Sequence, residues 1–402
     1  MPIPEKESGP MKTPSALTDY LPFVYTERDC ELFNKFHSDS SFVRVPLQHA
    51  KKLIPHLPAK TKIWVDAEID GLHQLATASE SFTKYAKDFE HCDKMVDPLF
   101  QAKPESSIVA KFVRAVLDLC AEVNPKLVSV PQLPITSDAS RNKINRELAR
   151  AASKWVETRP QITLILPVVF THQAQYTKKT ARNPKVAQVG QCFETAKAKG
   201  VWVVDASLTD QDGGGTLDAR LRGLIELHQE LAAVLPGNPS IVAGPYWGLN
   251  LVLWVRGSAR YPAVTLGNRY RYHLAGGRVQ KANTRIALDP IKRLVVAKPE
   301  LAGWLKEALK KIPASDPAYL EFLALSEKVS SLWRGDNRDQ ICRVYRKWLD
   351  SIAAAPAAGR ALTLYQQLSS AYVLGRTLGE LPEEGLARRP ERVAQQLMLL
   401  CL

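Results

Sequence analysis

Short runs of apolar residues recur along the first two-thirds of the chain, and most are followed by a stretch with helical spacing of apolar positions. Each run is rich in Val, Ile and Leu, which is typical of strands buried on both faces. Eight such runs occur, at residues 22–26, 42–47, 62–66, 126–131, 162–170, 200–205, 240–244 and 262–266. Helical patterns lie between them at residues 27–36, 48–57, 139–157, 185–199, 216–235 and 249–256.

This alternation over about 250 residues predicts an α/β fold, a (β/α)8 TIM-like barrel. An open doubly wound sheet is the alternative that the same pattern allows. The third connection, residues 71–125, is long and predicts a helical insertion with helices at 79–89 and 107–122.

The remaining segments suggest three parts: a flexible lead-in at 1–19, the barrel at 20–290, and an all-α extension at 291–402. We see no strand pattern beyond residue 290. Helices are expected at 301–312, 317–333, 338–353 and 362–378, and a last one from Pro390. The basic residues of 338–353 form no single stripe, so we expect this helix to pack on the barrel.

Composition narrows the class of protein. The 402 residues are 45% hydrophobic and 24% charged, enough apolar material for a large folded core. The six cysteines are scattered without a C-x-x-C pair, which argues against a zinc site and for free thiols in a reducing cytoplasm. They are Cys30, Cys92, Cys120, Cys192, Cys342 and Cys401. Neither a signal-peptide core nor an apolar run of membrane-spanning length occurs, so a cytoplasmic protein without a membrane partner is expected.

The active site of such a barrel forms where the strands end, so the residues after each run are the candidates for chemistry. Asp66, Glu68 and Asp70 follow the third run at alternate positions, and in extended backbone they would point the same way. They are candidates for binding a divalent cation or for acid–base chemistry, with Asp66 and Glu68 as catalytic and Asp70 as substrate-binding. A turn with capping carboxylates is the alternative. The sequence names no specific cofactor.

Two further strand ends carry candidate catalytic groups. His172 and Gln173 follow the fifth run, His172 as a proton-transfer group and Gln173 as a substrate contact, or else His172 is structural. Asp205 ends the sixth run and is predicted to face Asp66 across the barrel mouth. Asp210, Asp212 and three glycines at 213–215 follow, but the lysine that a phosphate-binding loop requires is absent.

The last two strand ends are rich in aromatic and basic residues. Tyr246, Trp247 and Asn250 follow the seventh run and offer a surface for stacking a base or sugar, unless they pack beneath the next helix. After the eighth run, basic and aromatic residues alternate where barrels often bind phosphate. The candidate substrate contacts there are Asn268, Arg269, Tyr270, Arg271 and His273.

The formal net charge is +13, and two stretches concentrate it. Residues 171–185 carry +4 and residues 256–293 carry +8. If both border the mouth, they form a basic rim suited to an anionic polymer or nucleotide. The residues assigned to nucleic-acid binding are Lys178, Lys179, Arg182, Lys185, Arg256, Arg260, Arg278, Lys281 and Arg285.

These features favour a barrel enzyme acting on a nucleic acid or nucleotide, with Asp66 and Asp205 as acid, base or nucleophile. The logic resembles that of the tRNA-guanine transglycosylases, barrel transferases that exchange a base using aspartates. The resemblance is confined to fold and charge, because that family's Cys/His zinc cluster and glycine-rich motifs are absent. Two alternatives remain open: an inert nucleic-acid-binding subunit with protein partners, and a metabolic enzyme for a small phosphorylated substrate.

Overall fold

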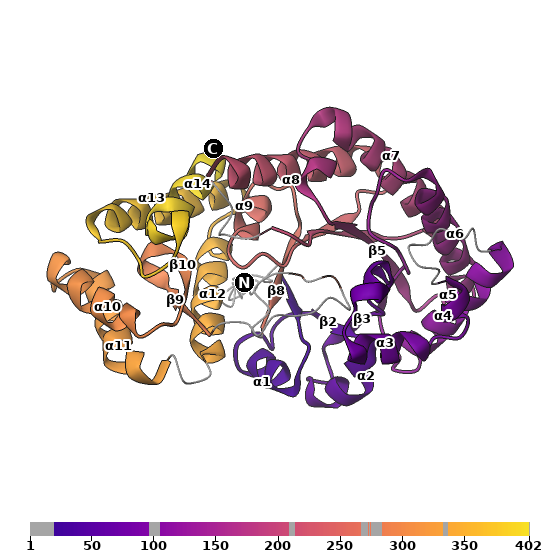
Figure 1. Cartoon of the computed structure of the whole chain (residues 1–402), viewed down its shortest axis with the longest axis horizontal. Coiled ribbons are helices and arrows are strands. Elements are labelled where there is room, and N and C mark those ends of the chain that lie inside the picture. Colours follow the sequence, from indigo (N-terminus) through magenta and orange to yellow (C-terminus); the bar gives the residue numbers. More distant parts are fainter. Residues whose placement is uncertain are drawn as a thin grey trace, which may run out of the picture.

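Eight parallel strands form a closed barrel in the computed structural model, as the sequence predicts (Figure 1). The structure describes residues 20–95, 105–208, 214–266, 272, 274, 284–332 and 337–401. Each strand pairs with the next along the chain, and β1 closes the ring on β8 with Leu21 opposite Ala263. The strands are β1 Leu21–Phe23, β2 Phe42–Pro46, β3 Lys62–Asp66, β4 Leu127–Ser129, β5 Thr163–Phe170, β6 Gly200–Asp205, β7 Ser240–Ala243 and β8 Tyr261–Thr265.

Aromatic side chains fill part of the barrel interior. Phe23 of β1, Trp64 of β3 and Trp202 of β6 meet edge to face, with ring centroids 5.6–5.8 Å apart. The Trp64 indole N–H donates to Ser129 of β4 at 2.9 Å, and the Trp202 indole N–H donates to the Gly244 carbonyl at 2.6 Å. These polar ends are paired, so large rings can close the interior without unsatisfied donors.

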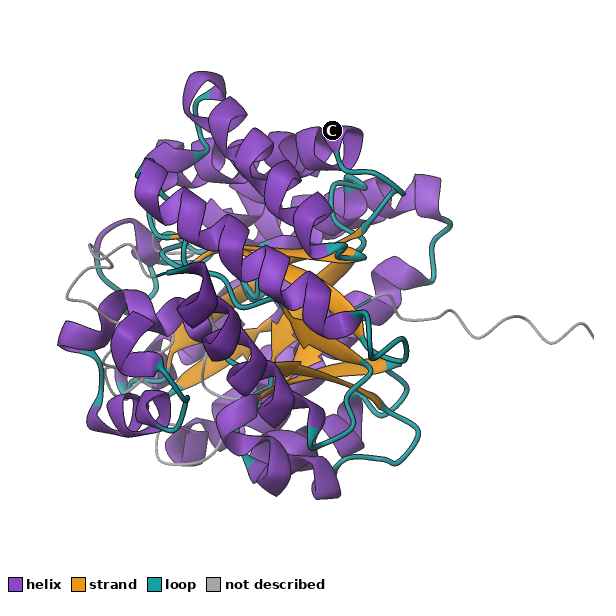
Figure 2. Ribbon diagram, turned by 90° about the vertical axis from the view of Figure 1, so that its right-hand side faces the viewer, coloured by secondary structure: helices purple, strands orange, loops and turns teal. Residues whose placement is uncertain are grey.

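Helices surround the strands (Figure 2). They start and end close to the predicted positions, although α7 begins six residues earlier than expected because Pro184 is accommodated inside it. The barrel helices are α1 Glu27–Phe36, α2 Leu47–Leu53, α5 Ser106–Ala121, α6 Ala139–Val156, α7 Lys179–Ala196, α8 Gly214–Val234 and α9 Asn250–Val255. Short 3-10 helices occur at η1 Ile54–His56 and η3 Gln173–Gln175.

The long connection between β3 and β4 is a helical insertion, as predicted. It begins with η2 Ile69–Thr77 directly beyond β3 and continues through α3 Glu80–Lys87 and α4 Cys92–Met95 before α5. The Tyr85 hydroxyl of α3 donates to the Ala67 carbonyl at 3.0 Å, which fixes the insertion over the end of β3.

The C-terminal extension supplies the helix that follows β8 in the barrel wall. α12, Arg338–Ala353, lies between α1 and α9 with Tyr345 and Trp348 buried (Figure 1). Its Tyr345 hydroxyl donates to the Asn250 side-chain oxygen at 3.1 Å, and the Asn250 amide donates to the Ala243 and Ala263 carbonyls of β7 and β8. This network confirms that the helix packs on the barrel.

A second hydrophobic cluster beside the barrel is formed mainly by the segment from residue 286 to 322, whereas the buried residues of α13 (Arg360–Thr377) and α14 (Arg392–Cys401) belong mostly to the main core. An antiparallel hairpin of β9 Arg285–Leu288 and β10 Arg293–Val296, joined by η4 Asp289–Ile291, opens this second cluster. This hairpin corrects the expectation that no strand follows residue 290. The remaining described elements are helical: α10 Glu300–Lys311, α11 Pro317–Leu332, η5 Ala357–Gly359, α13 Arg360–Thr377, η6 Gly385–Arg388 and α14 Arg392–Cys401.

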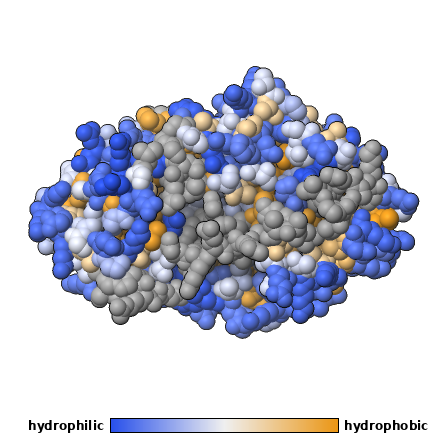
Figure 3. Space-filling view, in the orientation of Figure 1, coloured by the Kyte–Doolittle hydropathy of each residue, from blue (hydrophilic) through white to orange (hydrophobic). Residues whose placement is uncertain are grey.

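Among the coloured residues of the face shown in Figure 3, hydrophilic ones predominate and apolar ones are scattered between them. Across the described residues, none of the helices combines the length and hydrophobicity needed to cross a membrane.

Candidate active site at the carboxyl end of β3

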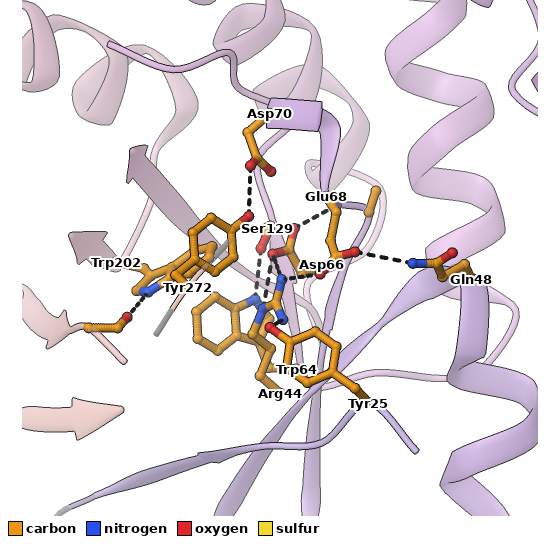
Figure 4. A network of polar contacts seen from close by, with 12 residues as sticks. Tyr25, Arg44, Gln48, Trp64, Asp66, Glu68, Asp70, Ser129, Trp202 and Tyr272 are labelled. Atoms are coloured by element: carbon orange, nitrogen blue, oxygen red, sulfur yellow. Dashed lines mark hydrogen bonds and ion pairs between the residues drawn. The ribbon is translucent and has the colours of Figure 1, made fainter. Parts of the chain in front are cut away.

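Asp66 and Glu68 come together on Arg44, whereas Asp70 points to Tyr272, and the backbone that carries them turns rather than staying extended (Figure 4). Asp66 is the last residue of β3, and its Oδ1 accepts the Glu68 backbone N–H at 3.0 Å. Glu68 has a left-handed φ of 56°, uncommon for a residue with a side chain, and Asp70 lies in η2. All three side chains are buried, with residues 3–4% exposed.

Arg44 of β2 holds two of these carboxylates. Its Nε donates to Asp66 Oδ2 at 3.0 Å, and its Nη2 pairs with both Asp66 Oδ2 and Glu68 Oε1, the latter at 3.0 Å. Its Nη1 donates to the Tyr25 hydroxyl at 2.9 Å, and the guanidinium lies 4.8 Å from the Phe23 ring centre and 5.0 Å from that of Trp202. Arg44 is fully buried.

The charge of Arg44 is stabilised by this environment. Burial alone would lower its pKa, but the neighbouring Tyr25, Asp66 and Glu68 outweigh that effect and hold the pKa well above its ordinary value. Arg44 was not among the site residues predicted from the sequence. The signal was a lone arginine inside the apolar run FVRVP, because a charge in a strand buried on both faces requires a partner.

Asp70 is in a different electrostatic situation. Its Oδ2 accepts the Tyr272 hydroxyl at 2.7 Å, and Tyr272 packs edge to face on Trp202 at 5.0 Å. Burial raises the pKa of Asp70 from 3.8 to about 7, and the negative charge of Asp66 adds to that effect. A carboxyl with a pKa near 7 can both donate and accept a proton at neutral pH.

Nothing among the described residues supports the divalent-cation interpretation of these carboxylates. Among the residues that the structure describes, no three His, Cys, Asp or Glu side chains are grouped so as to hold a metal ion. The physical reason is that the Arg44 guanidinium supplies the positive charge between Asp66 and Glu68 that an ion would otherwise supply.

Asp205 lies in a separate buried network at the end of β6. Its Oδ2 accepts a hydrogen bond from Arg220 Nε of α8 at 3.1 Å and another from the Tyr176 hydroxyl at 2.5 Å. Its Oδ1 accepts the Ser207 N–H and hydroxyl, both at 2.8 Å. Asp205 and Asp66 are therefore each paired with an arginine that the sequence analysis did not single out, and each belongs to its own network.

The other candidates after β5 and β7 have structural contacts. His172 is exposed and serves as the N-cap of η3, its Nδ1 accepting the Ala174 N–H at 3.1 Å. Gln173, half-buried, is the first residue of that turn. The Tyr246 hydroxyl accepts the Asp205 N–H at 2.6 Å, so Tyr246 supports the β6 network.

Trp247 and Asn250 face the extension. The Trp247 ring lies 4.8 Å from that of Trp348, and Asn250 is the buried link between β7, β8 and α12 described above. Trp247 therefore packs on α12 and not beneath the helix that follows β7 in the chain.

The basic candidates that the structure describes do not form one rim. Lys178 and Lys179 are exposed at the start of α7, near the end of β5. Arg182 is buried and paired with Glu226 and Glu230 at 2.6 and 2.9 Å, and the buried Lys185 donates to the Thr136 carbonyl. The charged groups of Arg182 and Lys185 therefore have their partners inside the fold.

Arg256 and Arg260 correct the prediction that residues 256–293 border the mouth. Both lie between α9 and β8, which places them at the amino end of the strands. Arg285 begins β9 in the extension. The other candidates after β6 and β8 lie outside the described residues: Asp210, Asp212, Asn268, Arg269, Tyr270, Arg271, His273, Arg278 and Lys281.

Neither the protein-family models nor the curated proteins with which the sequence was compared match it. The functional assignment therefore depends on the geometry of the site.

Proposed function

We propose that the protein is a barrel enzyme that performs acid–base chemistry on a nucleotide, free or within a nucleic acid, with Asp70 as the proton-transferring group. The observation that carries this proposal is the buried Asp70 carboxyl, whose pKa is raised to about 7 beside Asp66 and Glu68, the two carboxylates that share the single charge of Arg44. Strongly shifted pKa values at the carboxyl end of barrel strands are typical of catalytic groups.

Each neighbour of Asp70 has a distinct role in this proposal. Asp66 is a positioning residue, because its charge raises the pKa of Asp70. Arg44 holds Asp66 and Glu68 in place, and Tyr272 orients the Asp70 carboxyl through its hydroxyl. Asp205, paired with Arg220, is the second carboxylate at this end of the barrel.

The anionic part of the substrate is inferred from charge. The exposed Lys178 and Lys179 lie at the same end of the barrel as the carboxylates, in a stretch without acidic residues from 171 to 185. They are placed to contact phosphate, which positions a nucleic acid without reading its sequence. Six cysteines that are all free and buried agree with a cytoplasmic location, which is part of this proposal.

Binding of a fluorescein-labelled single-stranded RNA and of a nucleoside monophosphate mixture, each at two salt concentrations, tests the substrate class. We expect the Lys178→Gln/Lys179→Gln double variant to bind the RNA more weakly and to lower the salt slope by about 1 per lysine. Arg114→Gln, which removes one charge from the exposed face of α5, is the control and should bind as wild type.

Comparing the RNA probe with the monophosphate mixture distinguishes a polymer substrate from a free nucleotide. If the protein binds only the monophosphates, and with weak salt dependence, its substrate is a free nucleotide and not a nucleic acid. Failure of wild-type protein to bind either probe would overturn the proposed substrate class.

A further inference from the structure

Basic side chains form a stripe along the outer face of α6. All four members are exposed, and they recur at intervals of three or four residues, which places them on one face of the helix: Lys143, Arg146, Arg150 and Lys154. From its first to its last member the stripe is about 16 Å long, because an α-helix rises 1.5 Å per residue. These four residues are called the α6 stripe below.

Most of the charge of the α6 stripe has no acidic partner. Arg150 pairs at 2.5 Å with Glu147, the only acidic residue of α6. Glu157, at the C-cap, pairs with Lys197 of α7 at 2.9 Å. The other three members of the stripe form no ion pair with any carboxylate that the structure describes. Three positive charges therefore face solvent along this helix.

Other helices of the barrel wall compensate the charge of their surface arginines. On α1, α8 and α12 such arginines pair with a carboxylate of the same helix at 2.6–2.8 Å: Arg28–Glu31, Arg222–Asp218 and Arg346–Asp350. The excess of positive charge on α6 is therefore a local property of this helix. A row of uncompensated charges of one sign attracts a partner of the opposite sign.

The α6 stripe begins at the same end of the barrel as the candidate active site. α6 follows β4, so it starts at the carboxyl end of the strands, and Lys143 lies in its second turn. α7 packs beside α6 (Figure 1), and the exposed Lys178 and Lys179 lie where α7 starts, at the same end. The stripe therefore leads from the mouth along the outside of the barrel.

The residues of α6 favour one kind of anionic partner. The structure describes this helix throughout, and its exposed face has no large apolar side chain of the kind that a membrane-bound helix inserts among lipids. The only aromatic residue of α6, Trp155, is buried, so the bases of a single strand cannot stack on this face. Phosphate contacts without stacking suit a duplex, and one duplex strand has about five phosphates over about 16 Å.

We propose that the α6 stripe binds the phosphate backbone of a double-stranded nucleic acid and positions it beside the barrel mouth. The three unpaired cations contact successive phosphates of one strand, which fixes the position of the duplex without reading its sequence. The inference rests on the proposed function for the class of anionic polymer, because the stripe begins at the end of the barrel where the nucleotide is proposed to react.

Fluorescence anisotropy with a fluorescein-labelled RNA hairpin tests the proposal. The stripe variant, Lys143→Gln/Arg146→Gln/Lys154→Gln, removes the three unpaired charges. We expect it to bind the hairpin about tenfold or more weakly than wild type at about 0.1 M salt. The slope of log affinity against log salt concentration should become shallower by about 3, roughly 1 for each lost phosphate contact.

A variant of α10 is the matched control. Lys306→Gln/Lys310→Gln/Lys311→Gln removes three exposed positive charges from the extension and should bind the hairpin as wild type does. All six side chains are exposed, so both variants should unfold at the same urea concentration as wild type. Equal hairpin affinities in the two variants, or no hairpin binding by wild type, would overturn the stripe as a binding surface. An equally large loss with an unstructured single-stranded RNA would overturn the assignment to a duplex.

Failure of this inference is distinguishable from failure of the proposed function. If the stripe variant binds the hairpin as wild type does, while Lys178→Gln/Lys179→Gln binds RNA more weakly, the inference fails and the proposed substrate class stands. If hairpin binding depends on the stripe, but Asp70→Asn carries the same nucleotides as wild type, the inference stands and the proposed chemistry fails.

Discussion

Replacing Arg44 with methionine is expected to lower the free energy of unfolding by about 3–5 kcal/mol, the usual cost of breaking a buried ion pair from one side. Arg44 is fully buried, and its guanidinium is the partner of both Asp66 and Glu68. Methionine is apolar and shorter than arginine, and it leaves two buried carboxylates without their cation. Urea unfolding followed by tryptophan fluorescence measures the loss.

Two further variants make this prediction specific. Arg114→Met changes an exposed arginine of α5 in the same way and should alter stability by about 0.5 kcal/mol or less. Adding Asp66→Asn and Glu68→Gln to Arg44→Met removes the unpaired charges and should recover part of the loss. An Arg44→Met protein as stable as wild type would show that the carboxylates do not depend on the guanidinium.

Asp70→Asn is expected to become increasingly stable relative to wild type as the pH rises from 4 to 7. The pKa of Asp70 is about 7 in the folded protein and 3.8 ordinarily, so between these values the folded state retains a proton that the unfolded state has lost. The unfolding free energy of wild type therefore decreases as the pH rises through this window. Asparagine does not titrate, so the variant lacks this contribution.

The full effect is about 4 kcal/mol, from a shift of roughly three pKa units at 1.36 kcal/mol each. It is measured as the difference in unfolding free energy between Asp70→Asn and wild type at pH 4.5, 6 and 8. Asp88→Asn makes the same substitution at an exposed position of the insertion and is the control. A difference for Asp70→Asn that does not change with pH would contradict the raised pKa of Asp70.

The strands and most helices could be predicted because burial on both faces of a barrel strand leaves an unbroken apolar run. β3 and β6 match their predicted limits, and α1 and α12 match theirs. The hairpin of β9 and β10 was not predicted. Both strands pack on the extension and lie outside the alternation of strand and helix patterns from which the barrel was predicted.

The sequence predicted where the candidate site lies, but not which residues pair with its carboxylates. The position of Asp66, Glu68 and Asp70 beyond β3 follows from the direction of the strand. Arg44 and Arg220 could not be matched to their carboxylates without the barrel closure and helix packing that bring these residues together. Which carboxyl has the raised pKa also depends on burial in three dimensions.

The distribution of positive charge was the least predictable feature. Arg182 and Lys185 were counted as rim residues, but both are buried and hydrogen-bonded, because the face of α7 that carries them packs on its neighbours. Arg256 and Arg260 are close in sequence to β8 but precede it, and residues before a barrel strand lie at the end remote from the mouth.

The most direct test of the proposed function compares what wild-type and Asp70→Asn proteins carry when purified from cells, using mass spectrometry of nucleotides and sequencing of nucleic acid. Loss of a general acid–base group typically slows a reaction by about 10²–10⁴-fold, so the variant should retain an unconverted nucleotide species that wild type lacks. Identical nucleotide contents in the two proteins, matching those of a control protein purified in parallel, would contradict the account.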